Sequence, residues 1–301
     1  MRLKRNTGPL SIRWRALAAA AFGALLLAAC STVKLGYNNA DTLLVFALDS
    51  YLDLDSEQSQ LVRTRVQPLL AWHRTAQLPG YAQWLTDVER RIEQGRLGAE
   101  DLLALYSDAT AALERLSERA APALAALALT LTPAQIEHLE RKLDSDTSKA
   151  RRELARANGQ ESLEDRFKRN TERAETWLGP LTEAQRAQIR RTLLARPGNA
   201  AWWIEERERR QKALIALLRR VQAERPAPSV AADWLRAYFA GLATPQSAEV
   251  RAQIMEFRRG NAESIAALLD SATPEQRAHL IKRLRGYADD FTTLAAVGQR
   301  T

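Results

Sequence analysis

Apolar residues recur every three or four positions along most of the chain, and this spacing constrains the fold more than any other feature. Examples are Ile136, Leu139 and Leu143, and further along Leu214, Leu217, Leu218 and Val221. Such spacing places the apolar side chains on one face of an α-helix. Ala, Leu, Arg, Glu and Gln, which all favour helices, dominate the composition, and we find no convincing run of alternating β-branched residues. The sequence therefore predicts an all-α protein.

Glycine and proline divide the periodic segments into separate helices. Breaks are predicted at Pro79-Gly80, Gly95, Gly159, Gly179-Pro180, Pro197-Gly198 and Pro226-Ala227-Pro228. The helices are expected near 41–51, 56–75, 80–94, 99–129, 133–157, 161–178, 183–195, 199–224, 230–241, 246–270 and 274–296. Pro68 and Pro122 fall inside periodic runs, where we expect them to kink or split the helix. The prediction is a bundle of about ten helices over residues 41–301, possibly two sub-bundles divided near 159–180.

The first 29 residues have the pattern of an export signal. This region contains no acidic residue. Its basic residues are Arg2, Lys4, Arg5, Arg13 and Arg15. An uncharged apolar run, Ala16 to Ala29, follows them. Because a membrane-spanning helix needs about 20 apolar residues, this run is too short to remain as an anchor. We therefore expect residues 1–29 to be a cleaved signal peptide.

The lone cysteine of the chain stands directly after this run, in Leu26-Leu27-Ala28-Ala29-Cys30. These residues resemble the lipobox of bacterial lipoproteins, in which the cysteine receives a diacylglycerol and, after cleavage, a further acyl chain on its new amino group. The alternative is a free Cys30 after an ordinary secretory signal. Since Ser31 follows rather than Asp, the resemblance implies a lipid-anchored protein on the periplasmic face of the outer membrane, with residues 30–40 as a tether. A single cysteine also excludes an intrachain disulfide.

Cleavage would change the charge of the protein. The 44 Lys and Arg residues lose five members, which leaves 39 against 36 Asp and Glu, so the net charge falls from +8 to +3. The basic composition therefore gives no support to a nucleic-acid partner. The expected partners are the membrane, through the lipid, and an envelope protein, lipopolysaccharide or peptidoglycan.

A short motif recurs four times, at the predicted start of a helix. Its copies are 54–58, 131–135, 181–185 and 272–276, each with Asp or Thr at the second position and Gln at the fifth. This is the pattern of a capping box, in which the first side chain and the glutamine each accept a backbone N–H of the first helical turn. The unequal intervals argue against a solenoid. The motif also resembles the LTxxQ pattern of small periplasmic stress proteins, which implies a chaperone as an alternative function.

A second resemblance extends over most of the predicted mature chain. It rests on segments 34–39, 49–54, 72–74, 78–81, 166–170 and 177–179. Together they resemble an uncharacterised family of helical lipoproteins of Gram-negative bacteria, a domain of unknown function. The resemblance implies the location in the cell envelope and the helical fold, but no activity, cofactor or catalytic residue.

Two acidic residues and a histidine form one candidate site. Asp49 and Asp53 are four residues apart and would share a helix face, with His73 and Arg74 further along the chain. They would form either a metal or acid–base site, or a polar network of capped and arginine-paired carboxylates, which we favour. No metal and no cofactor is expected. His138 and His279, six residues after Thr132 and Thr273, are expected to be surface or interhelical side chains.

Two basic and aromatic clusters are candidates for binding a partner. Their residues are Arg166, Phe167, Lys168, Arg169 and Arg173 in the first, and Arg196, Trp202, Trp203, Arg207, Arg209 and Arg210 in the second. Guanidinium groups bind phosphate and carboxylate in a bidentate manner, which suits anionic envelope partners. Alternatively, nearby glutamates neutralise these arginines and the tryptophans pack in the core.

The function expected from these observations is a non-enzymatic binding or structural module of the cell envelope. A peptidoglycan hydrolase is a weaker alternative, since Glu161-Ser162 and Glu263-Ser264 match only two residues of the lytic transglycosylase pattern. No HExxH, phosphate-binding loop or GxSxG motif is present in the sequence.

Overall fold

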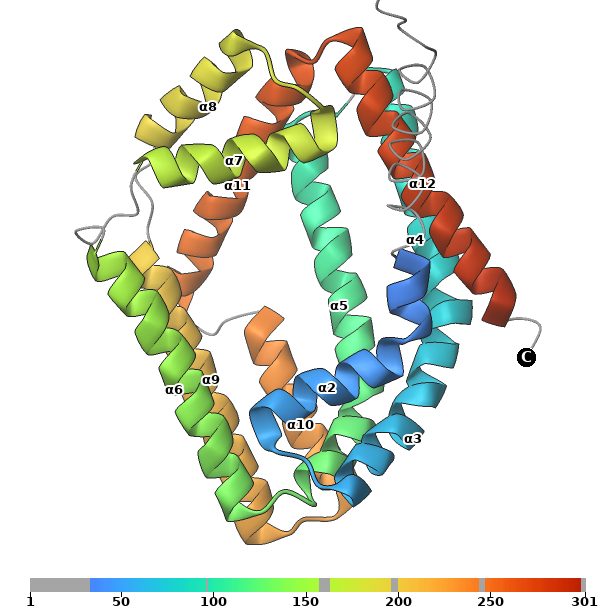
Figure 1. Cartoon of the computed structure of the whole chain (residues 1–301), viewed down its shortest axis with the longest axis vertical. Coiled ribbons are helices and arrows are strands. Elements are labelled where there is room, and N and C mark those ends of the chain that lie inside the picture. The colour runs from blue at the N-terminus through green and yellow to red at the C-terminus, as the bar shows by residue number, and fades with distance from the viewer. Residues whose placement is uncertain (1–32, 96, 157–162, 196–199, 244–246, 299–301) are drawn as a thin grey trace, which may run out of the picture.

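The structure, a computed structural model, describes residues 33–95, 97–156, 163–195, 200–243 and 247–298. These residues are almost entirely helical and contain no strand, as predicted (Figure 1). The helices are α2 (Ala40–Leu52), α3 (Ser56–Trp72), α4 (Leu78–Glu93), α5 (Ala99–Ala128), α6 (Pro133–Arg156), α7 (Leu163–Leu178), α8 (Glu183–Ala195), α9 (Ala200–Glu224), α10 (Pro228–Ala243), α11 (Ala248–Asp270) and α12 (Pro274–Gly298). Their ends lie within three residues of the predicted ones. None of the described helices is long and apolar enough to cross a membrane.

The structure bears on the breaks predicted at proline. Of the kink or split expected at Pro68 and Pro122, the split does not occur, because Pro68 lies inside α3 and Pro122 inside α5. The expected break at Pro79-Gly80 is absent, because Pro79 lies in the first turn of α4, where no partner for its nitrogen is needed. The irregularity falls just before it, in a π-helical turn, η1 (His73–Gln77), whose N–H···O bond runs from Leu78 to His73.

Long helices arranged in pairs give the molecule its shape. In Figure 1, α6 and α9 run side by side along one edge, α4 packs along α12 at the opposite edge, and α5 runs between the two edges with α10 against its C-terminal part. The short helices α7 and α8 lie across one end, and α2 crosses near the other.

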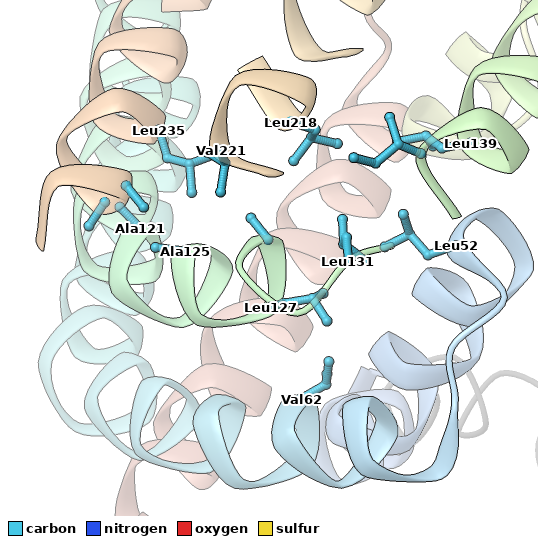
Figure 2. Close-up of a cluster of buried hydrophobic side chains, with 14 of the residues drawn as sticks. Leu52, Val62, Ala121, Ala125, Leu127, Leu131, Leu139, Leu218, Val221 and Leu235 are labelled. Atoms are coloured by element: carbon cyan, nitrogen blue, oxygen red, sulfur yellow. The ribbon is translucent and has the colours of Figure 1, made fainter. Parts of the chain in front are cut away.

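The buried residues form two main cores that are interleaved along the sequence. The first core draws on α2, α3, the C-terminal part of α5, α6, α9 and α10, and includes Val62, Ala121, Ile136 and Val221 (Figure 2). The second draws on α4, α7, α8 and α12, with Leu102 and Leu105 of α5 packed against it. The segment 159–180, where we considered a division into sub-bundles, therefore has helices of both cores on each side of it.

Candidate functional site

The four capping boxes predicted from the sequence are formed, and they meet in two pairs. At α3, Oε1 of Gln58 accepts the N–H of Asp55 at 3.1 Å, and the Asp55 carboxylate accepts the N–H of Gln58 at 2.8 Å. The corresponding N–H bonds to Oε1 start from Thr132, Thr182 and Thr273 at 3.0, 2.9 and 3.0 Å. The glutamines of α3 and α6 then meet each other, as do those of α8 and α12. We call each pair a glutamine clasp.

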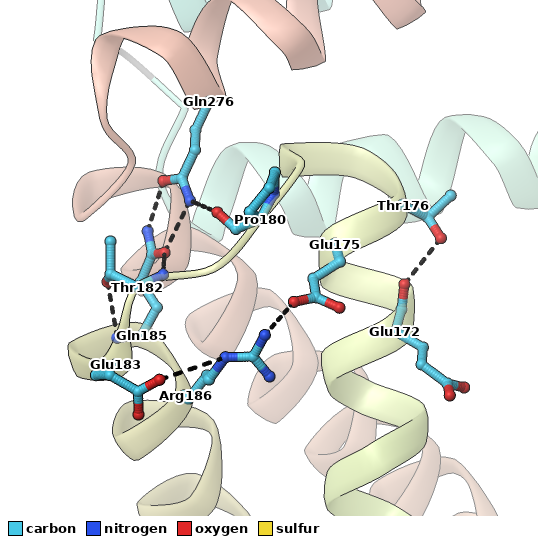
Figure 3. A network of polar contacts seen from close by, with 9 residues as sticks. All are labelled: Glu172, Glu175, Thr176, Pro180, Thr182, Glu183, Gln185, Arg186 and Gln276. Carbon is cyan, nitrogen blue, oxygen red and sulfur yellow. Dashed lines mark hydrogen bonds and ion pairs between the residues drawn. The ribbon is translucent and has the colours of Figure 1, made fainter. Parts of the chain in front are cut away.

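The two clasps have the same hydrogen-bond geometry. In the first, Nε2 of Gln58 donates to Oε1 of Gln135 at 3.0 Å and Nε2 of Gln135 donates back at 2.6 Å. In the second, Gln185 and Gln276 exchange the same bonds at 2.8 and 2.9 Å (Figure 3). Both amides of each clasp are buried. Because each oxygen accepts two bonds and each nitrogen donates two, these amides are fully satisfied.

The second donor of each amide reaches a backbone carbonyl two residues before the N-cap of the partner helix. The four acceptors are the carbonyls of Thr130, Asp53, Ser271 and Pro180, at 3.1, 2.9, 3.1 and 2.7 Å from Nε2 of Gln58, Gln135, Gln185 and Gln276. Each clasp therefore joins two helix starts and the two loops that lead into them. The repeated motif is a structural device that holds each core together, and its glutamines are used within the fold.

A second polar feature lies where the first described residues meet the body of the protein. Residues 33–38, which the sequence placed in a tether, are helical, and Val33 and Tyr37 pack against a small core formed by Leu78, Leu294 and Ala295. Lys34 Nζ forms an ion pair with Asp290 Oδ1 of α12 at 3.1 Å. The Asp290 side chain is only 2% exposed. Since its Oδ2 has no hydrogen-bond partner, Lys34 supplies the main compensation for this buried carboxylate.

Tyr37 links the same segment to the π-helical turn. Its hydroxyl lies 2.8 Å from Nδ1 of His73, and the two rings stack with centroids 5.8 Å apart. Tyr81 contacts the His73 ring edge-on at 5.6 Å. Burial among these rings lowers the pKa of His73 from its ordinary value of 6.5, because the charged imidazolium would lose its hydration.

Arg74 completes the contact. Its guanidinium donates to Oδ1 of Asn38 at 3.1 Å and stands over the Tyr37 ring at 5.1 Å. Burial is the largest influence on the Tyr37 hydroxyl and raises its pKa above 10.0. We call Lys34, Tyr37, His73, Arg74 and Asp290 the N-terminal joint, because together they fix residues 33–38 to α12 and η1.

The predicted polar network of Asp49, Asp53, His73 and Arg74 is only partly brought together. His73 and Arg74 share the N-terminal joint, whereas Asp49 and Asp53 stand at the opposite end of α2. Asp49 Oδ1 accepts the backbone N–H of Leu54 at 2.9 Å, and none of the described arginines pairs with it. Asp53 ends α2 in a left-handed conformation, with φ of 50°. The Asp49 carboxylate and the Asp53 backbone therefore serve the turn between α2 and α3, and the partner of His73 is Tyr37.

The first arginine cluster lies on α7 beside α8. Arg166 donates to the carbonyl of Leu193 at 3.4 Å, and burial lowers its pKa from 12.5. Arg169 is exposed and interacts with other residues of the chain. Lys168 is exposed and makes no ion pair within the described residues. In the first cluster, Arg166 therefore contributes to the packing of α7 against α8, whereas Lys168 and Arg169 are surface charges.

The second cluster is organised by one buried carboxylate. Glu206 is 4% exposed, and it accepts two bonds from Arg209 at 2.7 Å each and one from Arg210 at 2.6 Å. The hydrogen bonds from Arg209 are the largest of several effects that lower the pKa of Glu206. Trp202 is half-buried and Trp203 has a side chain outside the described set. Arg207 is exposed and has no ion-pair partner in the described part of the chain.

A cavity of about 260 Å³ adjoins this cluster. It lies between α9 and α10 and the start of α11, with Arg209, Arg210 and Tyr238 among its lining residues. Sequence reasoning missed both this cavity and the N-terminal joint. The joint depends on contacts between residues 36 and 256 positions apart in the chain, which no local pattern indicates.

The remaining candidates do not assemble into a site. His138 and His279 are half-buried on α6 and α12, two helices that belong to different clasps. Ser264 donates to the carbonyl of Gly260 within its own helix, at 2.7 Å, while Glu161-Ser162 and Cys30 lie outside the described residues. Among the described residues, no group of three or more His, Cys, Asp or Glu side chains is arranged to hold a metal ion.

Comparison with known proteins gives one match. A family model described as a family of unknown function (DUF6279) matches residues 50–227, which is more than half of the chain. No curated protein matches, and no solved structure matches.

Proposed function

Since the chain belongs to the DUF6279 family, whose function is unknown, we propose a function from its own residues. The protein is a lipoprotein that is acylated at Cys30, anchored to the periplasmic face of the outer membrane, and acts there as a non-enzymatic binding or structural module. The resemblance of residues 26–30 to a lipobox supports the acylation, and the export-like pattern before it supports the compartment.

The N-terminal joint is the observation that carries the structural side of this proposal. Only Ser31 and Thr32 separate Cys30 from Val33, the first residue packed against the body. Three residue steps span at most about 11 Å, so an acylated Cys30 would hold the helical body at the bilayer surface. Lys34 and Tyr37 resist detachment of this segment through the ion pair to Asp290 and the hydrogen bond to His73. A short, firmly seated attachment suits a protein that must keep a defined position in the envelope.

Acylation and address are tested by expressing the full chain with its own leader in a Gram-negative host. We expect the mass of the isolated protein to equal residues 30–301 plus a thioether-linked diacylglyceryl group and one acyl chain on the amino group of Cys30, and the protein to sediment with the outer membrane. Cys30→Ser is expected to remove both the added mass and the membrane association. A protein of native sequence that still begins at Met1, or one that carries a bare thiol, would contradict the proposal.

The binding side of the proposal rests on the second arginine cluster. Arg207 is exposed and takes no part in the Glu206 ion pairs, so Arg207→Glu reverses a surface charge without breaking that network. We expect this variant to lose crosslinks to an anionic envelope component, whereas the exposed Arg65→Glu on α3 keeps them. Equal crosslinking of both variants and the wild type would remove this cluster as the contact.

A periplasmic chaperone remains the second candidate from the LTxxQ likeness. The clasps already employ the glutamines of all four copies inside the fold. The motif is therefore explained by helix-start chemistry, and it gives a chaperone role no further support. Suppression of aggregation of an unfolded client by the purified chain would favour that role over the binding module.

A further inference from the structure

Helix α2 presents an apolar face to solvent directly after the N-terminal joint. Phe46 is 74% exposed and Leu43 is 54% exposed, and the two lie three residues apart on the same side of the helix. Ala47 and Ser50, also exposed, continue this side. We call Leu43, Phe46, Ala47 and Ser50 the outward face of α2.

The outward face carries no charge. The charged residues of α2 are Asp41 and Asp49. At about 100° per residue both lie more than about 100° around the helix from Leu43, whereas Asp49, three residues after Phe46, borders the face beside it. The opposite side is used by the fold, where Val45 and Leu52 are buried in the first core. Single exposed apolar side chains are normal on a protein surface, but here a large aromatic and a leucine adjoin on one side, with Asp49 at its border.

The number of residues between Cys30 and α2 limits how far the outward face can lie from the membrane. Leu35, which is itself 65% exposed, is five residues after Cys30, so its Cα lies within about 18 Å of the acylated residue. Phe46 follows eleven residues later in mostly helical chain, which adds about 17 Å at most. The N-terminal joint prevents this part from moving away from the body. Phe46 therefore lies within about 35 Å of the acylated residue, which keeps the outward face within reach of the membrane surface whenever the anchor is inserted.

We infer that the outward face of α2 lies in the interfacial region of the bilayer, with Leu43 and Phe46 in contact with acyl chains. This inference rests on the proposed acylation of Cys30. Helix α2 would then lie along the membrane surface, with its buried side, Val45 and Leu52, toward the body. The anchor supplies the affinity, while this face determines how the helical body is oriented relative to the membrane.

The test measures the depth of a spin label at position 46. Cys30 is the only cysteine and is blocked by acylation, so Phe46→Cys offers a unique thiol for labelling. The acylated full chain is reconstituted in phospholipid vesicles, and collisions of the label with oxygen and with a water-soluble nickel chelate are compared. Leu194→Cys, at the end of α8, is the matched control, because Leu194 is 62% exposed and belongs to a helix of the second core, whereas α2 belongs to the first. Both substitutions replace exposed side chains and are expected to leave the fold intact, which circular dichroism checks.

We expect the oxygen-to-nickel collision ratio to be several-fold higher at position 46 than at position 194. Equal, water-like ratios at both positions would overturn the inference. A label at 46 that is shielded from both reagents would mean that protein covers this face, for example a second copy, and would also overturn it. Intact mass separates the two proposals: an unacylated product contradicts the proposed function, whereas an acylated product with an aqueous position 46 contradicts the inference alone.

Discussion

Gln185 and Gln276, 91 residues apart, hydrogen-bond each other in both directions through their side-chain amides, and Gln58 and Gln135 repeat the arrangement in the other core. Gln185 is 1% exposed. It also accepts the N–H of Thr182 and donates to the carbonyl of Ser271. One side chain therefore satisfies a helix start, a loop and a partner helix at once.

Gln185→Ala is expected to lower the free energy of unfolding by about 3 kcal/mol, since it removes a cap and leaves buried polar groups without partners. Urea unfolding measures the change. Gln188→Ala is the control, because Gln188 is a half-buried residue of the same helix outside the clasp. A similar loss in both variants would contradict a special role for Gln185.

The pairing itself is tested by a double-mutant cycle. Gln185→Ala and Gln276→Ala are expected to be non-additive by about 1 kcal/mol or more, because each removes the other's partner. Gln58→Ala and Gln185→Ala belong to different clasps and should be close to additive. Additivity within the clasp would show that the two amides act independently.

Lys34→Ala removes the partner of the buried Asp290 carboxylate. Breaking a buried ion pair costs about 3–5 kcal/mol, and the partial exposure of Lys34 reduces this to about 2 kcal/mol. Amides 33–38 should exchange with deuterium faster in this variant. Adding Asp290→Asn removes the uncompensated charge and should restore part of the stability. If exchange of 33–38 is unchanged by Lys34→Ala, the ion pair does not hold the segment.

His73 gives the protein a dependence on mild acid. Its pKa is lower in the folded than in the unfolded chain, so the unfolded state binds the proton more readily. Stability should be constant with respect to this group above pH 6.5, fall as the pH drops below 6.5, and level off once His73 is protonated in the folded protein as well. Urea unfolding at a series of pH values should show a smaller decrease for His73→Asn than for the wild type. An equal decrease in His73→Asn and the wild type would contradict this role of His73.

Glu206 is predicted to make the stability of the protein depend on pH at more acidic values than His73 does. Its folded pKa lies below 4.5, so its stabilisation is present above pH 4.5 and is lost as the pH falls through the folded value. Glu206→Gln at pH 7 should cost about 2 kcal/mol, because the charge-assisted bonds from Arg209 and Arg210 are weakened. Glu205→Gln, an exposed neighbour, should change stability little in the same thermal or urea measurement. A comparable loss at Glu205 would argue against the buried network.

The helices could be predicted from the sequence because their ends depend on local chemistry. Asp55, Thr132, Thr182 and Thr273 each cap a helix as expected, and Gly95 and Gly179 take positive φ at the expected ends. The pairing of the capping boxes could not be predicted, since the second donor of each glutamine reaches a loop 72 to 96 residues away.

The candidate sites were predicted less well, for the same reason. Asp49 and His73 were grouped by helix spacing and sequence proximity, but the turn after α2 uses Asp49 locally. The π-helical turn directs His73 toward Tyr37. The alternative that glutamates neutralise the clustered arginines holds for part of the second cluster, since Glu206 pairs with Arg209 and Arg210.

The interleaving of the two cores has a practical consequence for anyone who dissects this protein. A fragment cut at the limits of the family match, 50–227, would contain Gln185 without Gln276 and would lack the α12 partner of α4. Excising either core is equally impossible with one cut, because α5 contributes side chains to both. For these reasons the helical body should be expressed and studied whole.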